Sequence, residues 1–181
     1  MARNELKRLA QNLDRLAVAA FSRAPAAASE KIVSELQERG PAWTGRFSNS
    51  WQIASESRIV SGSGNEGSPQ KISAPLLTGR ELLLKPEVKY TISNFATGPQ
   101  GPYARKAMDL EEGNYIYPGV PPLKPADRGT RTSGIRGQLT ISGEGPNRRT
   151  APLDWFTTYT NGGAIDRTVR ISFEQATKGI L

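Results

Sequence analysis

Apolar side chains in the first forty residues follow a helical spacing. They recur at steps of three and four and so share one stripe: Leu6, Leu9, Leu13, Leu16, Ala17 and Ala20. This spacing predicts an amphipathic helix over residues 3–22. Pro25 suits the first turn of a second helix, which Gly40 and Pro41 end. We therefore expect a helical hairpin or one kinked helix whose stripe faces the core, with a partner-binding stripe as the alternative.

The pattern changes to β-prone residues after Trp43. Phe47, Trp51 and Ile53 have spacings that suit a pleated strand, and residues 58–61 are expected to continue the sheet. Farther along, residues 88–93 alternate between apolar and polar side chains, which is typical of a strand with one buried and one wet face.

The last part of the chain returns to helical spacing. Pro102 is expected to open a short helix that Gly113 closes. Residues 165–180 place apolar side chains three or four apart and predict a terminal helix that covers the sheet, although their β-branched residues leave a strand open. Together the elements predict an α+β fold, in which N-terminal helices and a C-terminal helix pack on a small, mostly antiparallel sheet.

Two segments rich in glycine and proline interrupt this body. Residues 61–69 contain the spelling G-x-G-x-x-G at Gly62, Gly64 and Gly67. Nucleotide binding would need a helix directly after these glycines, and a proline-bracketed, β-like stretch follows instead, so a tip loop is expected. Residues 113–152 have too few large apolar groups for a core of their own, which predicts an extended arm. We expect residues 1–181 to form a single domain.

Composition narrows the function classes. The 181 residues include no histidine and no cysteine, which removes the commonest general base, thiol nucleophiles, disulfides and the best zinc ligands. The acidic cluster at residues 109–112 is interpreted as a solvated helix end, because neighbouring helical side chains diverge and no further acids add ligands. We expect no enzymatic activity, no cofactor and no metal. The sequence also lacks a membrane span or signal peptide, so a protein that stays in the cytosol is expected.

The formal net charge of +7 has a location. Residues 113–152 carry six basic side chains against two acids. These side chains could neutralise phosphates without reading sequence, or contact a neighbouring subunit: Lys124, Arg128, Arg131, Arg136, Arg148 and Arg149. A nucleic-acid-binding module that uses this arm is therefore the alternative function, and a merely solvated face is the plainer interpretation of the charge.

Two short motifs, in order, resemble those of a known family. The run from Trp43 to Trp51 contains Thr44, Gly45, Arg46 and Ser50, and resembles the "T-G-x-L-x-x-S" segment of small neck and tail-completion proteins of tailed bacteriophages. Phe47 stands where leucine is usual. Farther on, other residues look like that family's "Y-A … E-x-G" segment: Tyr103, Ala104, Glu111, Glu112 and Gly113.

The resemblance implies a structural subunit of the virion, assembled in the host cytoplasm. Such proteins form rings, here expected to be a hexamer or dodecamer, between the head or portal complex and the tail, and they let DNA pass. Portal or adaptor proteins and tail terminator or tail tube proteins are the implied neighbours, with transient, non-specific contact to DNA. Large aromatic residues such as Trp51 and Trp155 are candidate core or interface anchors.

Overall fold

The computed structural model describes residues 2–40, 45–77, 88–98, 101–102, 104, 108, 155–178 and 180. The elements follow in this order: α1 (Ala2–Val18), the π-helical turn η1 (Ala19–Arg23), α2 (Ala24–Arg39), the 3₁₀ turn η2 (Ser48–Ser50), β1 (Trp51–Ala54), β2 (Ile59–Ser61), β3 (Thr91–Asn94), β4 (Thr97–Gly98), β5 (Gly101–Pro102), α6 (Trp155–Asn161) and α7 (Ala164–Thr177). The fold class is α+β, as the sequence predicts.

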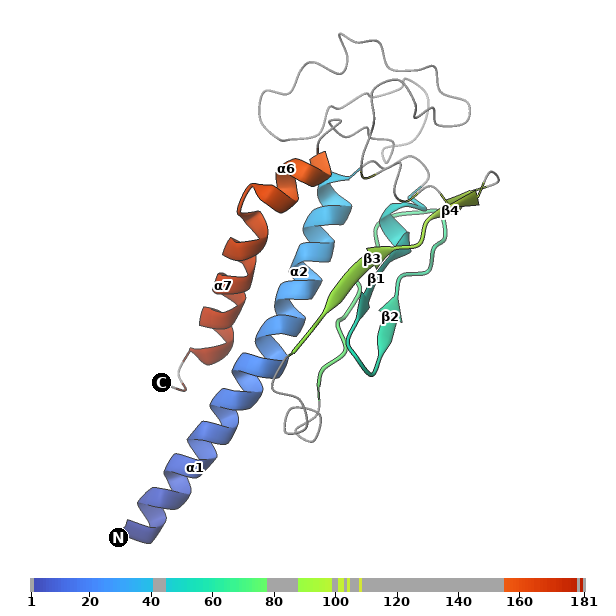
Figure 1. Ribbon diagram of the computed structural model, residues 1–181. Coiled ribbons are helices and arrows are strands. Elements are labelled where there is room, and N and C mark those ends of the chain that lie inside the picture. Colours follow the sequence, from blue (N-terminus) through green and yellow to red (C-terminus); the bar gives the residue numbers. More distant parts are fainter. Residues whose placement is uncertain are drawn as a thin grey trace.

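The N-terminal elements form one continuous helical rod (Figure 1). The helical hairpin is therefore wrong, and the single helix is confirmed. Pro25 lacks an N–H and its ring crowds the carbonyl one turn earlier, which disturbs a regular α-helix at this point. The helix absorbs the disturbance in η1, where the Ala24 N–H bonds to the carbonyl oxygen of Ala19. The rod continues to Gly40, whose N–H bonds to the Leu36 carbonyl oxygen at 2.9 Å.

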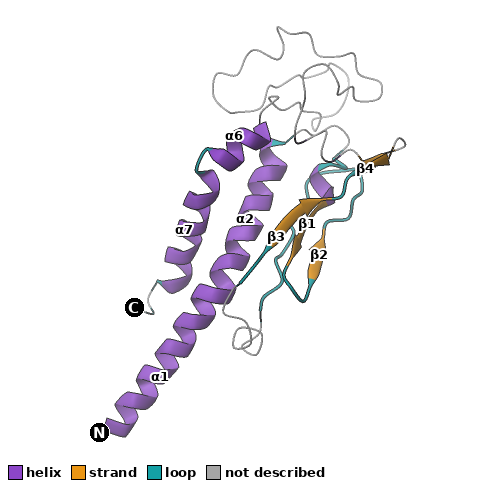
Figure 2. Ribbon diagram, in the orientation of Figure 1, coloured by secondary structure: helices purple, strands orange, loops and turns teal. Residues whose placement is uncertain are grey.

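A three-stranded antiparallel sheet in the order β2-β1-β3 forms the second part of the body (Figure 2). Ile53 pairs with Val60 on one side and with Ile92 on the other. The inward positions of β1, Trp51 and Ile53, are almost completely buried, which confirms the strand predicted for these two residues. The strand predicted over residues 88–93 is shorter in the structure and begins later, since β3 runs from Thr91 to Asn94.

The helices and the sheet form layers, with α2 between α7 and the sheet (Figure 1). The terminal element is thus a helix and not a strand, and it packs mainly on α2 instead of covering the sheet directly. The core lies where α2, β1 and α6 meet. Phe47 sits edge-on between Trp51 and Trp155, with ring centroids 5.6 Å and 6.2 Å away.

The strand expected to include Phe47 begins only at Trp51. Gly45 adopts a left-handed φ of 88°, and the Asn49 N–H bonds back to the Gly45 carbonyl oxygen at 2.9 Å. The Ser50 hydroxyl donates to the Arg46 carbonyl oxygen at 2.6 Å. Short polar side chains compete for backbone partners in this way and favour turns over strands. The segment before β1 is therefore a tight turn that delivers Trp51 to the core.

Candidate functional site

The turn before β1 is held by a buried asparagine. Asn49 is 1% exposed, and its amide nitrogen donates to the carbonyl oxygens of Asn65 and Ser68, both at 3.1 Å. Its side-chain oxygen accepts the Gln70 N–H at 2.9 Å. The loop after β2 is consequently fastened along the turn, instead of projecting away as the sequence suggested. This loop includes the G-x-G-x-x-G spelling, and residues 68–77, which follow its last glycine, contain no helix.

Beyond this loop, an extended segment of residues 70–77 runs beside the long helical rod. It belongs to no sheet, and polar side chains of the rod supply partners for its backbone. Gln37 donates to the Gln70 carbonyl oxygen at 2.9 Å, and Glu30 accepts the Ala74 N–H at 2.9 Å. One more such bond joins the Ser22 hydroxyl to the Leu77 carbonyl oxygen at 2.9 Å. Sequence reasoning missed this arrangement, because no local spacing pairs a helix side chain with a backbone atom this far along the chain.

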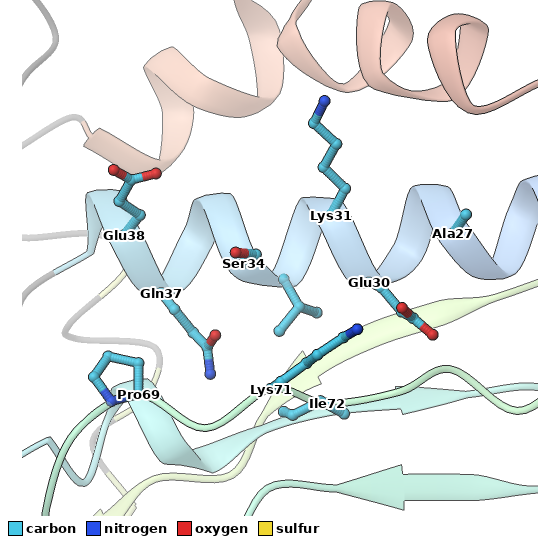
Figure 3. Close-up of a pocket in the computed structure, with 10 residues that line it drawn as sticks. Ala27, Glu30, Lys31, Ser34, Gln37, Glu38, Pro69, Lys71 and Ile72 are labelled. Carbon is cyan, nitrogen blue, oxygen red and sulfur yellow. The ribbon is translucent and has the colours of Figure 1, made fainter. Parts of the chain in front are cut away.

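An open groove of about 640 Å³ lies between α2 and the start of that segment (Figure 3). The charged side chains along it are of both signs: Glu30, Lys31, Glu38 and Lys71. Glu30 is already bonded to the backbone of Ala74. Because charges of both signs lie along it, the groove offers no concentrated field for a single anionic or cationic ligand.

A polar cluster fills the junction of α2 with α6 and α7. The Tyr159 ring is 2% exposed and stacks under the Arg39 guanidinium, which lies 5.3 Å from the ring centroid. Burial, followed by the nearby Glu35 carboxylate, raises the pKa of Tyr159 well above its usual value. The Thr168 hydroxyl approaches Glu35 at 3.5 Å. These contacts fasten α2 to both C-terminal helices.

The largest departure from the predicted core is α1. Residues 4–15 are exposed on every side, and α1 extends well past the rest of the body (Figure 1). Leu6, Leu9 and Leu13 are 66%, 57% and 57% exposed. The expectation that this stripe faces the core is therefore wrong over these residues, and the partner-binding alternative gains support. The stripe was correctly found, but its partner is not in the described chain.

The motif positions that the structure describes are mostly structural. Gly45 and Ser50 shape the turn, Trp51 lies in the core, and Ala104 is 9% exposed. Arg46 reaches the surface, where its guanidinium lies 3.4 Å from a Glu66 carboxylate oxygen. Other predicted positions lie outside the described residues: Thr44, Tyr103, Glu111, Glu112, Gly113, Lys124, Arg128, Arg131, Arg136, Arg148 and Arg149.

Comparisons with known proteins leave the family open. No family model matches the chain, and no match was found among curated proteins or solved structures. Within the described ranges, no helix combines the length and apolarity needed to cross a membrane. The same ranges contain no group of three or more acidic side chains placed to hold a metal ion. The uncovered apolar surface of α1 is therefore the feature on which a functional proposal can be built.

Proposed function

We propose that the chain is a structural subunit of a tailed-bacteriophage neck, either a head-tail connector or a tail-completion protein. Copies of it would form a ring that joins the head and portal complex to the tail and allows DNA passage. Its neighbours would be further copies of itself, portal or adaptor proteins, and tail terminator or tail tube proteins. The two ordered motifs around Thr44 and Tyr103 support this proposal, together with the body and projection that a ring subunit needs.

The observation that carries the proposal is a well-packed body with an uncovered helix. Asn49, Gln37 and the aromatic core make the body rigid, whereas the leucine stripe of α1 faces solvent. Contiguous exposed apolar surface marks interaction sites in soluble proteins. An assembly subunit combines these two features, because its own core fixes the shape and its open stripe recognises the next component.

Deletion of the coding sequence from the phage genome that carries it tests the proposal. We expect filled heads and complete tails to accumulate separately in negatively stained lysates. Joined particles should return when wild-type chain is supplied from a plasmid, and mass spectrometry should detect the chain in those particles. Normal numbers of joined, infectious particles from the deletion phage would rule out an essential joining role.

A nucleic-acid-binding module remains the second candidate because residues 113–152 carry six basic side chains against two acids. If all six neutralise phosphates of duplex DNA, the logarithm of the binding constant should fall with the logarithm of salt at a slope of about −5. Filter binding at two salt concentrations measures this slope. A chain lacking residues 113–152 serves as the control, and equal binding by both chains would refute the arm as the binding element.

A further inference from the structure

The described part of the chain has two uncovered apolar stripes, and both lie on helices. One is the leucine stripe of α1. The other lies on α7, where Val169 and Phe173 are one helical turn apart and are each 47% exposed. Each stripe has the spacing needed to pack against a helix.

These stripes cannot cover each other within one chain. α1 continues α2 through η1 as one rod, and α7 runs back along α2 only as far as η1 (Figure 1). From η1 toward the N-terminal end of the helix, α1 leads away from the body. Among the residues that the structure describes, no other part of the same chain covers either stripe, so a second molecule is the partner that we consider.

The spacing along α1 defines the kind of partner. Its leucines fall at the first and fourth positions of a heptad: Leu6, Leu9, Leu13 and Leu16. Such a seam packs against another α-helix by inserting side chains between those of the partner. Ala10 and Ala17 lie beside the seam and widen it, which lets a helix approach closely.

Two copies of the chain could associate through α1 on α1 or through α1 on α7. The area that each contact buries decides between these two arrangements. α1 has 17 residues. It is thus about 25 Å long and about 10 Å wide, so two projecting α1 helices would meet over a face of roughly 250 Å² in projection. A stable interface needs about 800 Å² on each partner. When α1 docks along α7, it also meets the body that carries α7. A subunit that donates its own α1 and accepts a second α1 on its α7 makes this contact twice.

We propose that the leucine stripe of α1 docks on Val169 and Phe173 of α7 in a second copy of this chain. The contact is heterologous, because donor and acceptor surfaces differ. Repetition of a heterologous contact closes into a ring or continues as a filament, and an isologous pair would stop at a dimer. The role of this contact in a neck ring rests on the proposed function, whereas the contact itself is a property of the purified chain.

Complementation between two broken subunits tests the proposal. The donor variant carries Leu9→Glu and Leu13→Glu, and the acceptor variant carries Val169→Glu and Phe173→Glu. Each should lose self-association by about a hundredfold or more in sedimentation velocity, because a charge replaces a buried apolar group. Mixed in equal amounts, they should form a one-to-one heterodimer and nothing larger, since one intact donor meets one intact acceptor.

Matched controls separate docking from folding and from charge. Asn4→Glu with Gln11→Glu adds the same charge to exposed positions of α1 outside the seam, and should assemble like wild type. Circular dichroism and thermal unfolding confirm that each variant is folded. Because Phe173 is half covered by its own body, Phe173→Ser provides a milder acceptor variant with the same expected direction.

Three results would overturn the docking proposal: wild-type chain that remains monomeric at every concentration, acceptor variants that assemble as wild type does, or a mixture that remains two monomers. The proposed function can fail separately. Deletion phage that joins heads to tails normally would remove the role in the neck and leave a measured self-contact standing. Conversely, the deletion phage could fail without the chain and yet be rescued by either variant as well as by wild type. That result would remove the contact and leave the role in the neck.

Discussion

Replacement of Asn49 by alanine tests how the body is held together. The Asn49 side chain makes three hydrogen bonds to the backbone of the loop after β2, and the residue is 1% exposed. Alanine removes all three bonds and leaves a small void beneath the loop. The loop carbonyls belong to Asn65 and Ser68, which are exposed and can be rehydrated, so the desolvation penalty of unpartnered groups is partly avoided.

At about 1 kcal/mol for each bond, Asn49→Ala should lower the free energy of unfolding by about 3 kcal/mol. For a chain of this length that loss corresponds to a fall in Tm of about 6–12 °C. Urea unfolding followed by tryptophan fluorescence measures the change, because Trp51 and Trp155 lie in the core. The donor variant of α1, which leaves the body intact, provides a folded reference.

Asn65→Ala is the matched control for this prediction. It removes the same type of side chain from the loop surface and keeps the backbone carbonyl that accepts from Asn49. We expect a change below about 0.5 kcal/mol, as for most surface substitutions. Equal, small effects of Asn49→Ala and Asn65→Ala would refute the view that Asn49 fastens the loop to the turn.

Four further substitutions probe other contacts. Gly45→Ala should prevent stable folding, because a Cβ there would lie 1.7 Å from the Gly67 carbonyl oxygen; Gly163→Ala, also at positive φ but with open space around it, should lose only about 1–2 kcal/mol in thermal unfolding. Similar Tm values for the two glycine variants would contradict this explanation. Gln37→Leu leaves the Ser48 and Gln70 carbonyl oxygens without their donor and should lower stability by about 2 kcal/mol in urea, and an unchanged midpoint would show that the contact is dispensable. The raised pKa of Tyr159 means that the unfolded chain loses this proton first, above about pH 10, so stability falls as pH rises. Tyr159→Phe should therefore flatten the alkaline part of the stability profile, and an identical slope in both proteins would argue against a buried, neutral tyrosine.

Periodicity predicted the elements more reliably than their surroundings. Leucine spacing identified the N-terminal helix, and β-prone residues at spacings that suit a pleated strand identified β1, because both patterns follow from backbone geometry. The same leucines were placed in the core by default, since a stripe does not reveal whether its partner belongs to the same chain. Only the direction of the rod past η1 showed that residues 4–15 leave the body.

Long-range polar contacts were beyond prediction for a different reason. Asn49 and Gln37 bond to backbone atoms more than ten residues away, and no local spacing encodes such a pairing. Phe47 was assigned to a strand on apolar spacing, yet the left-handed Gly45 and the backbone bonds of the Ser48–Ser50 turn determine its conformation. The motif run around Gly45 thus marks the turn that builds the core, and the surface that we propose for partners lies elsewhere, on α1.

Sedimentation velocity of the wild-type chain, from micromolar to submillimolar concentration, tests most directly whether α1 joins copies of this protein. We expect species heavier than the 19.6 kDa chain, with a population that grows with concentration and disappears when Leu9 and Leu13 are replaced by glutamate. A single 19.6 kDa species throughout, or an assembly unaffected by those replacements, would contradict this expectation.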